Sequence, residues 1–219
     1  RFERLSLTLR QHGVSEALVE LAAAAARDER RHAELCRELV AYLGAELGDV
    51  PTVGDQACAP AGLQPDQALI YEMVAMSCVT ETLSCVLLGE MVERCDDPHV
   101  QSTMRTILRD EVGHSRLGWG YLAEIQASGA QSFIGPYLPQ MLAGTVGDEL
   151  FSTAQLHPLA ARLGGLGALS RPERLRVFVA SMREVVFPGL ERFGIDTSAA
   201  QSWLAERQGE TSAGVDATA

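Results

Sequence analysis

Aromatic residues are scarce in this chain and make up only 5% of its 219 residues. Hydrophobic residues nevertheless make up 47%, so Ala, Leu and Val must build the core, which is typical of helical proteins. A chain of this length forms one domain, or one domain with an appendage, and can bury a substantial core. The composition therefore favours an all-α protein.

Basic residues are also few, with 18 Lys and Arg against 29 Asp and Glu, and the net charge is -11. A nucleic-acid-binding protein needs a basic surface to meet the phosphates, so this charge argues against a nucleic-acid partner. If some of the acids are metal ligands, bound cations would neutralise part of the excess.

Paired cysteines and long apolar runs are lacking as well. The five cysteines are an odd number and contain no Cys-x-x-Cys motif, which predicts reduced thiols in a cytoplasmic protein. Glu and Arg interrupt the apolar stretches before the roughly 20 residues that a membrane span needs. We therefore expect no membrane partner, and no signal peptide is recognisable.

Two copies of one five-residue frame stand out, DERRH at residues 28–32 and DEVGH at residues 110–114. Each places a Glu and a His three residues apart, on one face of a helix. One such pair is weak evidence, but two in a chain with five histidines are hard to attribute to chance. Between them Glu81 lies in an apolar run. A lone Glu combined with Glu-x-x-His pairs on other helices is the pattern of ferritin-like dimetal carboxylate proteins.

Hydrophobic periodicity and turn residues predict the helices. In the first part of the chain these cover residues 1–12, 15–43, 65–94 and 98–126, and the connection at 44–64 suits the single long crossover of a ferritin-like bundle. Downstream we expect one or two short helices in 127–169, a helix from 171 to 187 that Pro188 interrupts, and a last short helix from 197 to 206.

The predicted organisation has three parts. Residues 1–126 form a ferritin-like four-helix bundle whose first helix is truncated at its start. Residues 127–207 form a helical extension that packs on the bundle. Residues 208–219 are polar and small, and we expect a flexible tail there.

Glu81 and Glu111 satisfy a geometric requirement of an antiparallel helix hairpin. Glu81 precedes the intervening turn by 15 to 16 residues and Glu111 follows it by 14 to 15, so their carboxylates should face each other. The same requirement, applied to the first two helices, leaves Glu29 without a facing carboxylate. Glu3, the acid on the first helix, would lie roughly 10 Å from Glu29 along the helix axis at 1.5 Å per residue. We therefore expect a fourth carboxylate ahead of Arg1, outside this sequence.

Carboxylate and imidazole groups suit iron and manganese. The predicted metal ligands, through which any catalysis would proceed, are Glu29, His32, Glu81, Glu111 and His114. A ligating histidine needs an acceptor for its other ring N–H. We expect Asp28 to accept from His114 and Asp110 to accept from His32.

Surface salt bridges between two charged helices are the alternative explanation of the frames. The acids fall on the apolar stripes rather than on the polar faces, which favours a site. The remaining histidines, His12, His99 and His157, lie near helix ends or in loops and lack the frame. We assign them no role.

The frames DERRH and DEVGH, with Glu81 between them, resemble the ferritin-like diiron superfamily. Its members include ferritins, rubrerythrins, ribonucleotide reductase small subunits, multicomponent monooxygenases, acyl desaturases and manganese catalases. The longer segments DERRHAELC, CVTET and DEVGHSRLGW look like a bacterial group of ferritin-like domain proteins without an assigned reaction. The resemblance covers about residues 1–125 and implies the same five ligands, but it implies no substrate.

Three departures from the superfamily narrow the choice. Cys36 stands where radical-storing reductase subunits carry Tyr, so we expect no stored tyrosyl radical. Cys85 stands where the monooxygenases carry Thr, and Gly113 replaces the Arg of the usual frame. Cys78 and Cys85 flank Glu81 on one face. They either line a pocket, as Cys36 also could, or fill the core beside a crowded site.

The resemblance implies an oxygen-activating dimetal oxidase or oxygenase. Its cofactor would be two iron ions, with Mn/Fe or two Mn as the alternative, and its partners would be O2, a small organic substrate under a roof of residues 130–205, and an electron donor. A ferroxidase or iron store, a manganese catalase-like protein and a non-catalytic ferritin-like binding module stay open, as does assembly into a homodimer.

Overall fold

The structure, a computed structural model, describes residues 1–48, 58–151 and 163–216, with side chains up to Gly209. Across these ranges the chain is helical and forms no strand, and an isolated β-bridge joins Cys95 to Leu166. The prediction of an all-α protein is confirmed.

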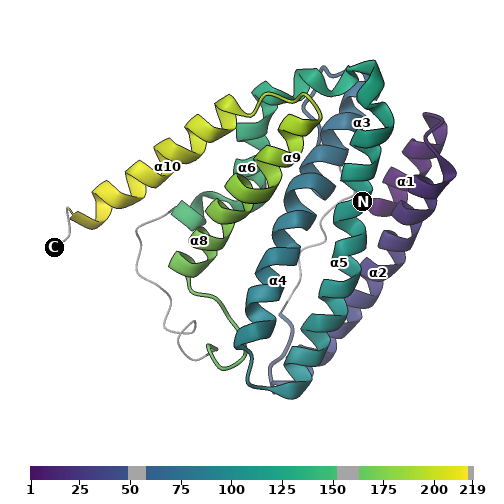
Figure 1. The fold of residues 1–219 in the computed structure, drawn as a ribbon. Helices are drawn as coiled ribbons and strands as arrows, with labels where there is room; N and C mark the ends of the chain where they lie inside the picture. The colour runs from purple at the N-terminus through teal and green to yellow at the C-terminus, as the bar shows by residue number, and fades with distance from the viewer. Residues whose placement is uncertain (49–57, 152–162, 217–219) are drawn as a thin grey trace.

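The first part of the chain forms a layer of long helices (Figure 1). These are α1 (Phe2–Gln11), α2 (Glu16–Tyr42), α5 (Pro98–Ile125) and one continuous helix made of α3 (Pro65–Met73), η1 (Val74–Glu81) and α4 (Thr82–Arg94). Helix α5 packs against both α2 and the α3–η1–α4 helix, and α1 packs on α2. Helix α2 ends at the end of the layer opposite to the start of α3 (Figure 1).

Local residues explain where these helices begin and end. Gly13 follows α1 with φ of +69°, a left-handed conformation that glycine adopts readily. Pro65 opens α3, where its missing N–H costs nothing. The Asp97 carboxylate accepts the backbone N–H groups of His99 at 2.9 Å and Val100 at 3.0 Å, which caps α5.

The C-terminal elements pack on the side of the α3–η1–α4 helix that faces away from α2 (Figure 1). In chain order they are η2 (Gln126–Ser128), η3 (Ala130–Tyr137), α6 (Leu138–Val146), η4 (Asp148–Phe151), α8 (Arg171–Ser181), η5 (Met182–Val186), α9 (Phe187–Arg192) and α10 (Ser198–Asp216). Their buried side chains continue the core of the helix layer, and Phe178, Met182 and Leu190 are almost fully buried.

Two predictions for this region were wrong. Pro188 does not interrupt its helix, which continues through α9 to Arg192. The widened turns of η5 precede the proline and accommodate its missing N–H and its ring. The tail predicted from residue 208 is helical to Asp216. Buried Ala200 and Leu204 anchor the start of α10, and extending a formed helix costs little.

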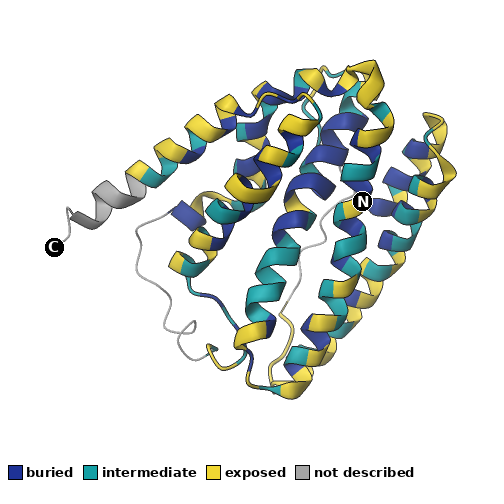
Figure 2. Ribbon diagram, in the orientation of Figure 1, coloured by how far each residue is buried: buried dark blue, intermediate teal, exposed yellow. Residues whose placement is uncertain are grey.

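The α3–η1–α4 helix is the most deeply buried of the long helices (Figure 2). In the part of the chain that is described, residues Pro65–Arg94 alone form a helix whose length and composition would suffice to cross a membrane, with a mean hydropathy of 1.3 in its most apolar window. Charged residues interrupt this helix at Glu72 and Glu81, as we expected. Half of that window is buried inside the protein, and a central core helix has the same composition.

Helical periodicity predicts one apolar face of α2, which includes Ala25, His32, Cys36 and Leu43. This face is buried only in the first part of the helix. Ala25 and His32 are buried, whereas Cys36 is exposed and Leu43 is 46% exposed. Cys36 therefore lies on the surface of α2 rather than in the buried core.

Gly118 allows α5 to approach η1 closely. A Cβ atom at this position would lie 2.7 Å from the Cβ of Ser77 and 2.9 Å from the backbone nitrogen of Cys78. Both of these residues are fully buried, so the contact is between backbones rather than between flexible side-chain ends. The close approach holds α5, which carries Glu111, directly against η1, which carries Glu81.

Gly118→Ala should lower the free energy of unfolding by about 1–3 kcal/mol, because the new methyl group must push two helix backbones apart. Chemical denaturation monitored by circular dichroism measures this change. Gly89→Ala is the matched control, since a Cβ there meets nothing within 4 Å. It should be neutral or should stabilise by up to about 1 kcal/mol. Equal effects of the two substitutions would contradict the close approach.

An ion pair joins the C-terminal helices to α4. Glu173 accepts hydrogen bonds from the backbone N–H of Ser170 at 2.8 Å and from its hydroxyl at 2.6 Å, and it pairs with Arg94. These bonds to Ser170, followed by the Arg94 guanidinium, lower the pKa of Glu173 from 4.5 to about 2. The charged carboxylate therefore stabilises the fold above pH 4.5, and this contribution is lost as the pH falls towards 2.

Glu173→Gln should lower the melting temperature at pH 6, because Gln can still accept the Ser170 hydrogen bonds but carries no charge for Arg94. The difference from the unmodified protein should shrink as the pH falls from 4.5 towards 2, and calorimetry across that range measures it. Glu184, an exposed acid of η5, provides the control Glu184→Gln. A difference that is independent of pH would rule out the ion pair as its cause.

Candidate metal centre

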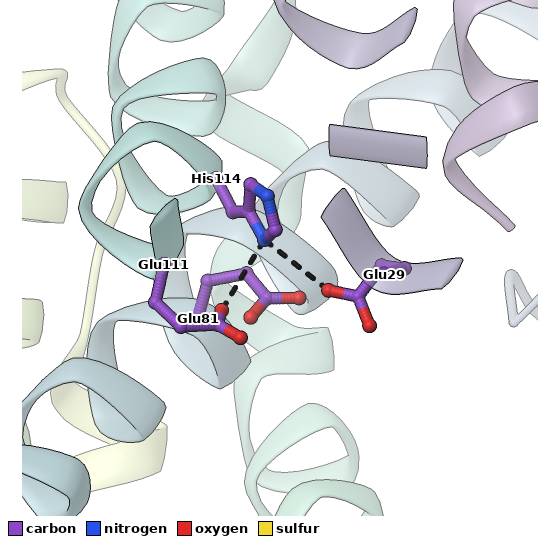
Figure 3. Close-up of side chains that lie close together, drawn as sticks. All are labelled: Glu29, Glu81, Glu111 and His114. Atoms are coloured by element: carbon purple, nitrogen blue, oxygen red, sulfur yellow. Dashed lines mark ion pairs between the residues drawn. The ribbon is translucent and has the colours of Figure 1, made fainter. Parts of the chain in front are cut away.

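Four side chains from three helices converge in the middle of the helix layer. Glu29 comes from α2, Glu81 from the end of η1, and Glu111 and His114 from α5 (Figure 3). One potential ligand atom from each lies within 4.8 Å of those of the other three. Residues far apart in sequence thus form one site of the kind the two frames predict.

The imidazole of His114 lies between two of the carboxylates. Its Nδ1 is 3.2 Å from Oε1 of Glu29 and 3.3 Å from Oε2 of Glu111. The ring of Phe2 packs against it with the ring centroids 5.2 Å apart. The side chain is 2% exposed, so water is almost excluded from this histidine.

His32 approaches the same carboxylates from the other side of Glu111. Its Nδ1 lies 3.4 Å from Oε1 of Glu111 and 3.8 Å from Oε1 of Glu29, and the centroids of the two imidazoles are 5.7 Å apart. One oxygen of Glu111 therefore faces His32 and the other faces His114. A carboxylate in this position can contact two cations at once.

The outer nitrogens of both histidines point to the aspartates that precede the glutamates. Nε2 of His32 lies at hydrogen-bonding distance, 3.0 Å, from Oδ2 of Asp110, which also accepts from Arg31. Nε2 of His114 lies 3.5 Å from Oδ2 of Asp28 but makes no hydrogen bond. When Nε2–H of His32 donates to Asp110, its Nδ1 is deprotonated and can act as a ligand.

Several buried polar atoms of the site have no hydrogen-bond partner. Among the described residues these include Nδ1 of His32, Nδ1 of His114 and Oε2 of Glu111. Buried polar atoms are nearly always satisfied, because leaving one unpaired costs about 1–3 kcal/mol. These three atoms, two imidazole nitrogens and a carboxylate oxygen, make no hydrogen bond and lie close together. Nitrogen and oxygen atoms of this kind are suitable ligands for a divalent cation.

The protonation of the site reflects the crowding of its acids. Burial, together with the contact with Glu111, raises the pKa of Glu81 to about 9. Burial also favours neutral Glu111, but contacts with His114 and Glu81 outweigh it and lower the pKa of Glu111. Burial opposes the charged form of His114, yet Glu111 and Glu29 raise its pKa to about 10. Without cations the site therefore retains protons, which bound metal would displace.

The aspartate behind His32 is held in its charged form. Burial alone would raise the pKa of Asp110, but the contacts with His32 and Arg31 lower it below its usual value. Arg31 also lies 3.5 Å from Asp28. Arg31, the fourth residue of the first frame, therefore contacts both aspartates. The sequence did not predict this contact.

Glu3 and the cysteines stand apart from the cluster or beside it. Glu3 pairs with Arg30 at 2.5 Å and is largely exposed. Cys78 is fully buried beside Gly118, so it packs the core. Cys85 is half-buried near the cluster, and burial raises the pKa of its thiol to about 11.

The three histidines outside the frames lie away from the cluster or outside the described residues. Nδ1 of His12 is 2.6 Å from Oδ1 of Asp66. His99 packs against the ring of Tyr42 with the centroids 4.5 Å apart. His157 lies outside the described residues.

A cavity of about 470 Å³ adjoins the cluster. It is lined by Arg1, Phe2, Glu3, Ala26, Glu29, Arg30, Ala33, Met76, Thr80 and Glu81. We expected the pocket beneath residues 130–205, but this cavity opens between α1, α2 and η1. The sequence carried a signal for it, because Ala26 precedes Glu29 by three residues and Ala33 follows it by four, which places both on the face of α2 that bears Glu29.

Asp110→Asn should weaken metal binding by roughly 10- to 100-fold while the protein stays folded, because an amide no longer offsets the charge of a metal-bound imidazole. Metal titration followed by calorimetry measures the affinity, and circular dichroism checks the fold. The control is Glu34→Gln, which changes an exposed acid of α2. If Asp110→Asn behaves like this control, Asp110 does not support His32 as a ligand.

Comparison of the chain with protein-family models, with curated proteins and with solved structures gives no match. A functional assignment therefore depends on the chemistry of the cluster and of its surroundings.

Proposed function

We propose that this chain is a ferritin-like dimetal-carboxylate oxidoreductase that binds two iron ions between α2, η1 and α5 and uses O2 to oxidise a small organic substrate. The observation that carries the proposal is the set of unpaired donor atoms around Glu111, with one imidazole on each side of that carboxylate. Such a set can hold two cations.

The arrangement of the helices supports a ferritin-like bundle. Helix α2 ends at one end of the layer and α3 starts at the other (Figure 1), as the second and third helices of such bundles do. Three of the four helices supply acids of the pattern, a Glu-x-x-His pair from α2, another from α5, and Glu81 from η1, whereas α1 adds no acid to the cluster.

Each residue of the site has a role under this proposal. Glu29 and His114 would hold one ion, His32 would hold the other, and Glu111 would contact both, with Glu81 completing the set from η1. Two bound iron ions would supply the electrons and the Lewis acidity that O2 reduction needs. Asp110 fixes the tautomer of His32, and burial excludes bulk water from both imidazoles, whereas Glu29 is accessible to solvent.

A cavity lies beside Glu29 and Glu81. Its walls combine the apolar side chains of Phe2, Ala26 and Met76 with charged side chains that include Arg1 and Arg30. Its volume of about 470 Å³ falls within the roughly 300–1,000 Å³ range of small-molecule pockets.

The purified protein should bind about two iron ions per chain and consume O2 when Fe(II) is added anaerobically and air is then admitted. Glu111→Gln should lower both quantities strongly, because it removes a charged group between the two imidazoles. Elemental analysis and an oxygen electrode provide the measurements.

Glu93→Gln, which changes an exposed acid of α4, should leave metal content and O2 consumption unchanged. Binding of manganese with oxygen evolution from peroxide would favour the catalase-like alternative, and rapid iron oxidation by a large assembly would favour an iron store. A folded protein that takes up no metal would leave only the non-catalytic binding module.

A further inference from the structure

Arg31 lies between the two aspartates that face the outer nitrogens of the histidines. Its Nη2 donates a hydrogen bond to Oδ2 of Asp110 and lies 3.5 Å from Oδ1 of Asp28. Oδ2 of Asp110 is also 3.0 Å from Nε2 of His32. On the other side, Oδ2 of Asp28 is 3.5 Å from Nε2 of His114. A continuous series of polar contacts therefore leads from one imidazole to the other, and Arg31 is its central member.

In the described part of the chain, no second arginine pairs with both aspartates. Arg109 approaches Asp110, with Nε 3.8 Å from Oδ1, but its side chain is 72% exposed and it forms no ion pair with Asp28. In the second frame the residue before the histidine is Gly113, where a Cβ atom would meet nothing within 4 Å. The two aspartates therefore share the guanidinium of Arg31.

The two ends of this series are held to different degrees. The Asp110 side chain is 12% exposed and forms hydrogen bonds with both Arg31 and His32. The Asp28 side chain is 31% exposed, both of its contacts are 3.5 Å long, and Nε2 of His114 makes no hydrogen bond. A contact of this length constrains orientation less than a charge-assisted hydrogen bond does. Because Arg31 attracts one oxygen of Asp28, the other oxygen is directed at His114.

We infer that Arg31 is a positioning residue that couples the two imidazoles. It orients both aspartates, so that a change at one aspartate also alters the histidine that the other aspartate contacts. The role of the histidines as metal ligands rests on the proposed function. The coupling between the two rings is a property of the metal-free protein and can be measured there.

The first test measures the proton and nitrogen resonances of the imidazoles by NMR in the metal-free full chain at neutral pH. Arg31→Met should change the resonances of both His32 and His114, because it removes the contact that the two aspartates share. Arg27→Met is the control, since Arg27 is an exposed residue of α2 that forms no ion pair within the described residues, and both histidines should be unchanged. Circular dichroism checks the fold, and Arg31→Gln is the second variant should Arg31→Met unfold.

The second test separates coupling from direct contact. Asp28→Asn should change the resonances of His32, with which Asp28 forms no ion pair in the described ranges. In a protein that also carries Arg31→Met, Asp28→Asn should leave His32 unchanged, because the interaction between two sites is lost when the residue that joins them is removed.

Metal binding provides a third readout under the proposed function. Arg31→Met should weaken the binding of Mn(II) by about threefold or more at both positions, as calorimetry measures. This effect is smaller than the roughly 10- to 100-fold loss expected for the direct partner of a ligand. Arg27→Met should leave Mn(II) binding unchanged.

The inference is overturned if Arg31→Met changes only one histidine or neither, or if Asp28→Asn still changes His32 without Arg31. Mn(II) binding that Arg31→Met leaves unchanged would also overturn the role of Arg31 in positioning the ligands. Metal content and O2 consumption are measured on the same preparations. Coupled rings in a protein that takes up no metal would contradict the proposed function alone, whereas metal uptake and O2 consumption with uncoupled rings would contradict the coupling alone.

Discussion

Mutual repulsion among three carboxylates is the constraint on which the centre of this protein depends. Glu29, Glu81 and Glu111 bring their oxygens within 4.8 Å of one another and of His114, and the burial of Glu81 and Glu111 reduces the solvation of their charges by water. Without metal, bound protons reduce this repulsion, and the pKa of Glu81 rises to about 9 and that of His114 to about 10. Two divalent cations would satisfy the same charges and would also pair the buried donor atoms that have no partner.

The helices around the site hold these groups together against their repulsion. The close approach of α5 to η1 at Gly118 fixes the relative level of Glu111 and Glu81, and buried Cys78 and Ser77 leave no room for slippage. Asp110 contacts Nε2 of His32 and is itself hydrogen-bonded to Arg31, which fixes the orientation of the imidazole. The C-terminal helices pack on the opposite side of the α3–η1–α4 helix, so they support the core and leave the cavity open towards α1 and α2.

Much of this arrangement could be predicted from the sequence, because it follows from spacing. The distances of Glu81 and Glu111 from their common turn place them at one level, and the structure brings both frames and both preceding aspartates to one site. What depends on helix length and packing was predicted poorly. The exposure of Cys36 depends on which helices cover α2, which its own periodicity does not reveal. The helix through Pro188 depends on widened turns, and the position of the cavity depends on residues that are distant in sequence.

Anomalous X-ray diffraction from crystals grown with Fe(II) under anaerobic conditions would locate bound iron in the cluster. Two iron peaks should appear roughly 4 Å apart, one beside His114 and Glu29 and the other beside His32, with Glu111 close to both. A cluster that remains without a peak at full iron saturation, or iron bound only at surface acids such as Asp66 beside His12, would contradict this dimetal centre.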